Sequence, residues 1–514
     1  MEAAGSGPIT TIQAGHVAGR RTAWGIEFLG IPYAAAPLQE ARFAPPGPVR
    51  PWTGTRACTD LSPVCPQIET YGPVGTGALS ALRQDETCLC LNVRTPSLDG
   101  RQPVLVWLHG GGLALGSGGE PYLTQGAFAQ SGVVEVTINY RLGLLGFMPV
   151  ADGAAPANRG LRDQIAALQW VHDNIAAFGG DPSRVTIGGR SGGGFSVAGL
   201  LAAARASGLF HRAVLNSGFG NAYLLLNEAD HVARLVAAHL GLDGPTVRAL
   251  AEVPIAALLG AQKALCDDCY THHDYGTFGA PAILGLPFQM VIDGDVLLAP
   301  PAAALAEGGA ADVPLMITTT SEEALTHTSV YRDLDWEAYG RVVSERVRWP
   351  FGDPAEVNAY YRRVSGDRDP LAALTSLIGD LMFQLAGCRL ALAQAPHAAV
   401  YKAIFEGEGS ARHGDDVGYV WWSRRLNDAR VPPRHRATDQ DLAETVHGAV
   451  VSFIRTGMPA MPGGLDWRPY TLQDPTVMSW RVAGCTVTPD PFVERLPLMS
   501  RARYSDVAVG AAGT

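Results

Sequence analysis

Lysine, basic runs and long apolar runs are scarce in this chain of 514 residues, and each shortage excludes a class of function. Lys263 and Lys402 are the only lysines, no run of five basic residues occurs, and the formal net charge is −10. Neither nucleic acid nor an anionic membrane is therefore expected as a partner. No run of eighteen apolar residues and no basic start followed by an apolar stretch occurs, which predicts a soluble cytoplasmic protein.

Cysteine is also sparse, with eight residues in the whole chain, too few for a disulfide framework. Most thiols are therefore expected to be reduced and buried. Cys266 and Cys269, followed by His272 and His273, resemble half of a zinc site, but no second cysteine pair lies nearby, so we expect no metal. No nucleotide-binding loop is present and no cofactor is expected, which leaves small-molecule chemistry.

Short β-branched runs alternate with helical patterns along the chain, which is typical of an α/β fold with a parallel sheet covered by helices on both faces. Apolar residues at helical spacing predict one such helix over 161–178, ended by Gly179 and Gly180. We expect one large domain, 1–514, with cap-like insertions near 220–300 and 325–395. The expected strands are 104–109, 133–140, 185–189, 213–218, 313–319 and 398–405.

The clearest motif is Gly-Arg-Ser-Gly-Gly at 189–193, which directly follows one expected strand and precedes a helical stretch. This is the G-x-S-x-G nucleophile elbow in its required context, where flanking glycines permit a sharp turn and Ser191 becomes the nucleophile. The alternative is a glycine-rich turn that serves only packing. Upstream, the strand 104–109 ends in His-Gly-Gly-Gly, a loop type that supplies backbone donors to an oxyanion hole. Gly111, Gly112 and Gly192 are the candidate donors.

A serine nucleophile needs a histidine that takes its proton and a carboxylate that orients the histidine, in the chain order serine, acid, histidine. His413 follows the expected strand 398–405, whereas His327, His435 and His447 follow no comparable strand. Glu322 and Glu323 both lie at the end of the strand 313–319, and periodicity does not choose between them.

Together these stretches resemble the type-B carboxylesterase and cholinesterase family, its bacterial carboxylesterases included, from about residue 8 to about residue 500. The resemblance implies an α/β-hydrolase fold and a serine carboxylesterase that hydrolyses small-molecule esters through an acyl-enzyme. It rests on FLGIPYA (28–34), RFAPP (42–46), DETCLCLNV (85–93), HGGG (109–112), INYRLGLLGF (138–147), DQIAALQWVHDNIAAFGGDPSRVTI (163–187) and HGDD (413–416).

The same resemblance assigns further roles. It makes Glu323, and not Glu322, the catalytic acid, and it supports His413 as the base. It gives Ser217 a supporting contact with the acid. It also implies a disulfide between Cys65 and Cys88, with two reduced thiols as the alternative if the protein stays in a reducing compartment.

The elbow departs from the family, which usually has glutamate before the serine and alanine after it, where this chain has Arg190 and Gly192. One hypothesis is that the Arg190 guanidinium binds a carboxylate or phosphate of the substrate. The other is that it turns away and pairs with a structural carboxylate. Two other functions stay open: an acyl-transfer, cyclising or tailoring enzyme with the same triad, and a non-catalytic binding protein on the same fold.

Overall fold

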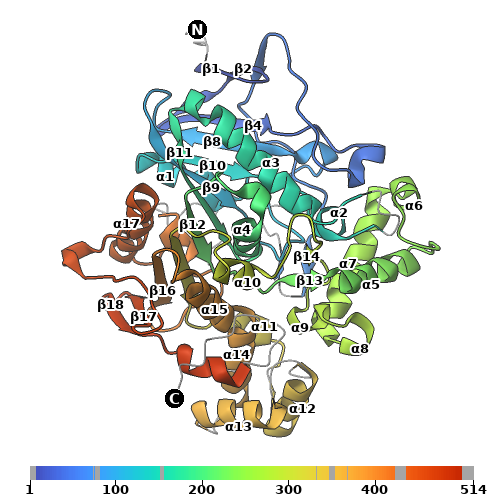
Figure 1. Ribbon diagram of the computed structural model, residues 1–514, viewed down its shortest axis with the longest axis vertical. Coiled ribbons are helices and arrows are strands. Elements are labelled where there is room, and N and C mark those ends of the chain that lie inside the picture. The colour runs from blue at the N-terminus through green and yellow to red at the C-terminus, as the bar shows by residue number, and fades with distance from the viewer. Residues whose placement is uncertain are drawn as a thin grey trace.

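The computed structural model describes residues 7–72, 74–75, 82–150, 155–331, 333–346, 353–366, 369–422 and 436–499. Its centre is an eleven-stranded sheet (Figure 1). From one edge to the other the strands are β18 (Thr486–Pro489), β17 (Thr476–Arg481), β16 (Val400–Gly407), β15 (Leu315–Thr320), β12 (Arg212–Asn216), β11 (Gly180–Arg190), β9 (Gln102–Leu108), β10 (Val134–Ile138), β8 (Cys90–Thr95), β4 (Gly25–Pro32) and β3 (Arg20–Thr22).

The expected parallel sheet is confirmed. Each predicted strand largely coincides with one of β9, β10, β11, β12, β15 and β16, and these strands pair in parallel. The sequence did not single out β17, which extends the parallel part, or the antiparallel strands β3, β4, β8 and β18 at the two edges. The carboxyl ends of the parallel strands therefore form one edge, where loops from distant segments meet.

Side chains of the central strand β9 alternate between two hydrophobic cores, because successive residues of a strand point to opposite faces. Val104, Val106 and Leu108 belong to one core, and Leu105 and Trp107 to the other. The helices that complete the first core include α3 (Arg159–Asn174), α4 (Gly192–Ala202), α10 (Pro301–Ala306) and α15 (Leu385–Gln394); those of the second are α1 (Ala127–Gln130), α16 (Val417–Val420) and α17 (Gln440–Thr456).

The helix predicted over 161–178 is confirmed with a change near its end. The α-helical part α3 stops at Asn174, and a 3₁₀ turn continues from Ile175 to Phe178 before Gly179 adopts a φ of 75°. A left-handed residue at this place ends the helix, and glycine adopts that conformation without a steric penalty. Gly180 already begins β11.

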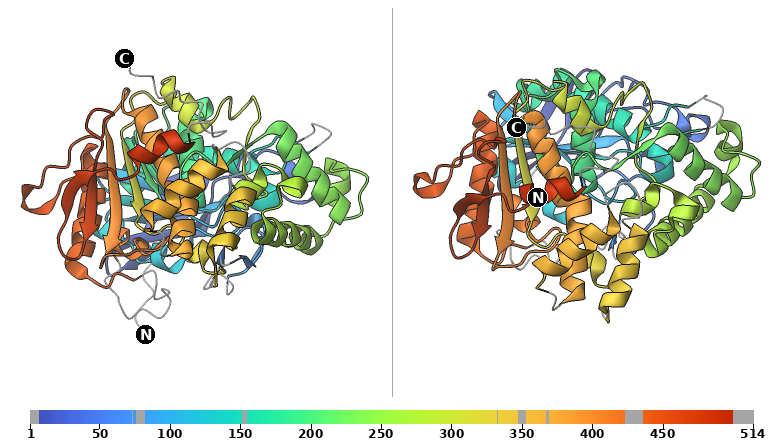
Figure 2. Two further views of the ribbon diagram at one scale, coloured as in Figure 1. Left: turned by 90° about the horizontal axis from the view of Figure 1, so that it is seen from below. Right: turned by 60° about the horizontal axis from the view of Figure 1, so that its bottom comes forward.

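The segments expected to be insertions form two helical groups outside the large sheet (Figures 1 and 2). The group that is later in the sequence, within 325–395, contains a π-helical turn, Asp380–Gln384. It ends in α15, which packs on β15 and β16. The first consists of β13 (Tyr223–Leu225), α5 (Leu226–His239), α6 (Val247–Glu252), α7 (Ile255–His272), α8 (Tyr275–Phe278), α9 (Pro281–Leu284) and β14 (Met290–Ile292); the second of α11 (Leu325–Thr328), α12 (Trp336–Arg346), α13 (Pro354–Val364) and α14 (Pro370–Gly379).

Smaller elements complete the described chain. They are a three-stranded sheet of β1 (Ile9–Ile12), β2 (Gly15–Ala18) and β5 (Thr55–Ala57), a hairpin of β6 (Thr70–Tyr71) and β7 (Val74–Gly75), and the helix α2 (Gly143–Phe147). Among the described residues, one helical stretch, Pro370–Gln394, is long and apolar enough to cross a membrane, and 83% of its most apolar window is buried inside the protein. Its apolarity therefore matches its place in the core.

Candidate active site

Ser191 lies in the sharp turn between β11 and α4, with a φ of 54° and a ψ of −121°. This backbone conformation is strained for a residue with a side chain. The turn is tight because its glycines approach other backbone atoms: a Cβ on Gly189 would stand 2.4 Å from the carbonyl carbon of Gly193. A Cβ on Gly193 would stand 2.0 Å from the carbonyl oxygen of Leu108. The elbow predicted from the motif therefore has the geometry that the motif requires.

The glycine loop after β9 packs directly on this elbow. Gly111 and Gly112 have φ values of 112° and 59°, which favour glycine. A Cβ on Gly110 would lie 3.5 Å from Cβ of Ser191, and a Cβ on Gly192 would lie 2.8 Å from the backbone nitrogen of Gly112. The backbones of the predicted oxyanion donors therefore meet beside Ser191, at the N-terminus of α4, where the helix dipole favours negative charge.

Two neighbouring strand ends bring together the predicted base and acid. His413 follows β16 and Glu323 follows β15, and the Nδ1 atom of His413 lies 2.6 Å from Oε2 of Glu323. The backbone joins the two loops as well, since the Glu322 amide donates to the carbonyl oxygen of Ala411 at 2.8 Å. With Nδ1 engaged by the carboxylate, proton transfer to or from a reacting group falls to the other ring nitrogen, Nε2.

Glu323 is 1% exposed and is held by three hydrogen bonds. Besides the bond with His413, its Oε1 accepts from the Ser217 hydroxyl at 2.6 Å and from the Thr320 amide at 2.8 Å. Burial raises the pKa of Glu323 to about 7, although the bonds from Ser217 and Thr320 lower it. The carboxylate that contacts His413 is that of Glu323, while Glu322 is half-buried, so the geometry distinguishes the two adjacent carboxylates, as periodicity did not.

Aromatic side chains to which the sequence motifs assigned no role in the site surround the histidine. The Phe383 ring, presented by the π-helical turn, lies 4.7 Å from that of His413, and the His327 ring lies 6.1 Å from it. The hydroxyl of Tyr270 lies 2.7 Å from Nδ1 of His327, and the Tyr71 ring lies 5.9 Å from the Tyr270 ring. These side chains come from the Tyr71 hairpin and from both helical groups, and only their apolar or aromatic character is visible in the sequence.

Over most of its length the chain is similar to known proteins of one family. The model of the family described as "Carboxylesterase family" matches residues 6–494. The chain belongs to the carboxylesterase family. It is 32% identical to phenmedipham hydrolase of Pseudarthrobacter oxydans, over 94% of this chain and 97% of that protein. It is also 32% identical to para-nitrobenzyl esterase of Bacillus subtilis, over 90% of this chain and 92% of the other.

Solved structures agree with the family assignment. A carboxylesterase of Geobacillus stearothermophilus superposes with a TM-score of 0.82 and 31% identity, covering 96% of this chain and 99% of that one. A para-nitrobenzyl esterase structure gives 0.80 at 30% identity, with the same coverage of both chains. The fold is therefore the α/β-hydrolase fold, and the protein is a carboxylic ester hydrolase.

Arg190, where the family usually has glutamate, packs in this esterase on the loop that carries His413. A Cβ on Gly414 would stand 2.1 Å from Nη2 of Arg190. The Nε atom of Arg190 is buried and has no hydrogen-bond partner among the described residues. Both hypotheses about Arg190, a substrate anion or a structural carboxylate as its partner, stay predictions.

The other histidines considered for the site have different surroundings. His447, on α17, is buried, with Nδ1 at 2.8 Å from the carbonyl oxygen of Val420 and Nε2 at 2.8 Å from the Ser131 hydroxyl. It therefore joins α17 to its neighbours in the second core. His435 lies outside the described residues.

The cysteines of the esterase are free thiols in the structure. Cys65 and Cys88 are buried side by side, and burial followed by a hydrogen bond with Cys88 raises the pKa of Cys65. The disulfide that the family resemblance implied stays a prediction. Cys266 and Cys269 are buried on α7, and no group of three or more metal-ligating side chains that could hold an ion occurs in the part of the chain that the structure describes.

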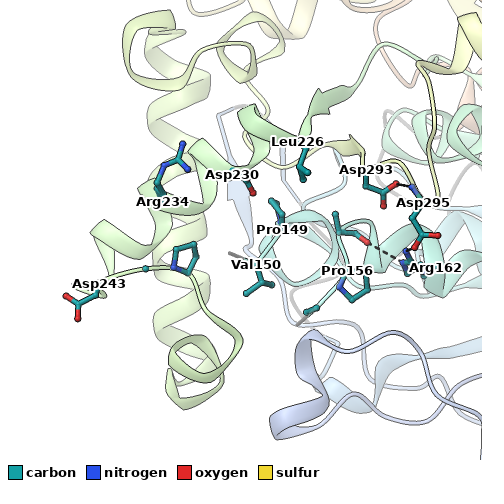
Figure 3. A pocket seen from close by; sticks show the side chains of 14 residues that line it. Pro149, Val150, Pro156, Arg162, Leu226, Asp230, Arg234, Asp243, Asp293 and Asp295 are labelled. Atoms are coloured by element: carbon teal, nitrogen blue, oxygen red, sulfur yellow. Dashed lines mark hydrogen bonds and ion pairs between the residues drawn. The ribbon is translucent and has the colours of Figure 1, made fainter. Parts of the chain in front are cut away.

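A pocket of about 650 Å³ lies between α3, α5 and the turn 293–295 (Figure 3). Arg162, Asp293 and Asp295 of its lining interact with other residues of the protein: Arg162 pairs with Asp295, and Asp293 accepts from the Asn158 side chain. None of the residues that line it belongs to the candidate active site.

Proposed function

We propose that this esterase hydrolyses small-molecule carboxylic esters through an acyl-enzyme on Ser191, with His413 as general base and Glu323 as the carboxylate that orients it. The observation that carries the proposal is the 2.6 Å contact between Nδ1 of His413 and Oε2 of Glu323. This contact holds the imidazole in the loop that follows β16. The loop lies at the same edge of the sheet where β11 ends, directly before the strained Ser191.

In the first half-reaction, Nε2 of His413 takes the proton of the Ser191 hydroxyl while the oxygen attacks the ester carbonyl. The amides of Gly111, Gly112 and Gly192 donate to the oxyanion that forms. The protonated imidazole, stabilised by Glu323, then gives its proton to the leaving alcohol, and the C–O bond breaks. In the second half, water attacks the acyl-enzyme by the same steps and releases the acid.

The role of Ser217 follows from the burial of the acid. A carboxylate must be ionised to stabilise the imidazolium, and ionisation is costly at a site that is 1% exposed. The Ser217 hydroxyl and the Thr320 amide donate to the ionised form and so favour it. We therefore assign Ser217 to the support of Glu323.

The first test is hydrolysis of p-nitrophenyl esters, from acetate to decanoate, by the wild type, Ser191→Ala and Ser207→Ala. Ser207 is an exposed serine away from the elbow and serves as the matched control. We expect hydrolysis by the wild type and the control, none above background by Ser191→Ala, and an acyl adduct on Ser191 by mass spectrometry. Activity that survives in Ser191→Ala would refute the nucleophile, and a wild type that hydrolyses none of the esters would count against the proposal.

The second test uses the two adjacent glutamates as each other's control. Glu323→Gln keeps the shape of the side chain but loses the charge that stabilises the imidazolium, and we expect kcat to fall by about 10³- to 10⁴-fold. Glu322→Gln keeps the carboxylate of Glu323 and its contact with His413, so we expect its kcat to stay within about threefold of the wild type. The opposite ranking would assign the acid to Glu322.

A further inference from the structure

Arg190 ties the nucleophile strand to the histidine loop. It is the last residue of β11, directly before Ser191, and the Nη2 end of its guanidinium lies next to Gly414, which directly follows His413. A Cβ at 414 would stand 2.1 Å from Nη2 and 2.8 Å from Cζ of the arginine, and the φ of Gly414 is 94°. The positive φ and this close contact both favour glycine at 414, so the guanidinium packs directly on the histidine loop.

Two buried carboxyl groups share the surroundings of this guanidinium. Glu323 is 1% exposed and Asp416 is 0% exposed. Asp416 accepts from the Asn216 side chain at 2.6 Å, while its second oxygen has no partner among the described residues. Burial raises the pKa of Asp416 to about 6, the charge of Arg190 lowers it, and the charge of Glu323 raises it again.

Other titratable groups near Arg190 include Tyr122, with Glu120 beside it, and, through its contact with Glu323, His413. Burial raises the pKa of Tyr122 well above its ordinary value, Glu120 raises it further, and Arg190 lowers it. A phenol whose pKa is raised stays neutral over the working pH range, so Tyr122 adds no negative charge beside Arg190, whereas Glu323 and Asp416 do when they ionise.

We propose that Arg190 is a positioning residue of the triad: its charge keeps Glu323 and Asp416 ionised together, and its contact with Gly414 supports the loop of His413. The inference rests on the proposed function, because it concerns the same base and acid. It also gives a reason for the unusual residue before the nucleophile, since a glutamate there would add a third carboxyl to the two already buried.

Electrostatics determines the sign of the effect. Glu323 is productive when ionised, and its two charged neighbours act in opposite directions: the cation of Arg190 favours ionisation and the anion of Asp416 opposes it. Removing Arg190 should therefore move the acid limb of the activity profile to higher pH. Removing the charge of Asp416 should move it to lower pH. A residue that only packs would scale the rate equally at all pH values.

The experiment measures kcat/KM for p-nitrophenyl butyrate from pH 5 to pH 10 in the wild type, Arg190→Gln, Arg190→Lys, Asp416→Asn and Arg248→Gln. Arg248 is an exposed arginine on α6 and serves as the charge-matched control. We expect the acid limb of Arg190→Gln to shift upward by about one pH unit and that of Asp416→Asn to shift downward by a similar amount. Arg190→Lys keeps the charge and should lie closer to the wild type than to Arg190→Gln, and Arg248→Gln should match the wild type.

Active-site titration with a fluorophosphonate reports the fraction of each variant that has a competent Ser191. If Arg190→Gln does not fold, the downward shift of Asp416→Asn still tests the charge balance. An unshifted acid limb in Arg190→Gln or Asp416→Asn, with Ser191-dependent activity in the wild type, would overturn this inference and leave the proposed function intact. Hydrolysis that survives in Ser191→Ala would instead refute the proposed function.

Discussion

Removal of the Ser217 hydroxyl tests how the buried acid is kept ionised. The hydroxyl donates to Oε1 of Glu323 at 2.6 Å, and a hydrogen bond to a charged group contributes about 1.5–3 kcal/mol. At about 1.4 kcal/mol for each pKa unit, Ser217→Ala should raise the pKa of Glu323 by one to two units above its value of about 7. The ionised fraction at pH 7, and with it kcat/KM, should then fall by roughly five- to fiftyfold.

The assay is the pH dependence of kcat/KM for p-nitrophenyl butyrate, with Ser207→Ala as the control for loss of a serine hydroxyl. Activity of Ser217→Ala should recover towards the wild-type value as the pH rises to about 10, because the higher pH restores the ionised carboxylate. A decrease of equal size at every pH would refute the reasoning, since it would mean that Ser217 positions the acid without affecting its charge.

Three shorter predictions concern packing and buried charge. Gly189→Ala should lower the free energy of unfolding by about 1–3 kcal/mol or more in urea titrations, because the new Cβ would stand 2.4 Å from the backbone of Gly193. Lys402→Met leaves the charge of Asp490 uncompensated at a 5% exposed position and should lower the free energy of unfolding by about 3–5 kcal/mol. The double variant Lys402→Met, Asp490→Asn should regain most of this loss. Glu323→Gln should raise Tm at pH 8 but not at pH 4.5. The pKa of Glu323 in the wild type is about 7, above the ordinary 4.5, so the native state loses stability as the pH rises from 4.5 to 7 and the carboxyl ionises.

The sheet and the elbow could be predicted from the sequence because each depends on local pattern. Strands buried on both faces appear as continuous β-branched runs, such as 133–140, and the chain order of strand, glycine-flanked Ser191 and helix specifies a sharp turn. The position of His413 after such a run was enough to place it at the same edge of the sheet as the serine. The strand β17 follows a long loop and forms a hairpin with β18, and its short run carried no comparable signal.

What the sequence did not predict depends on contacts between distant segments. Nothing in the neighbourhood of Phe383 indicates that a π-helical turn presents its ring to the imidazole of His413, since that turn arises where α14 and α15 join against the sheet. The direction of the Arg190 side chain likewise depends on Gly414, more than two hundred residues along the chain. Each of these contacts is a packing relation that periodicity does not contain.

The buried charges around the triad have a common physical reason. A carboxylate that orients an imidazole acts most strongly where water is excluded, yet the same exclusion favours the neutral acid that cannot do so. In this esterase the conflict is reduced by donors from neighbouring strand ends, Ser217 and Thr320, and by the cation of Arg190 behind the histidine loop. The acid therefore titrates near neutrality, and hydrolysis should increase from acidic to alkaline pH as Glu323 ionises.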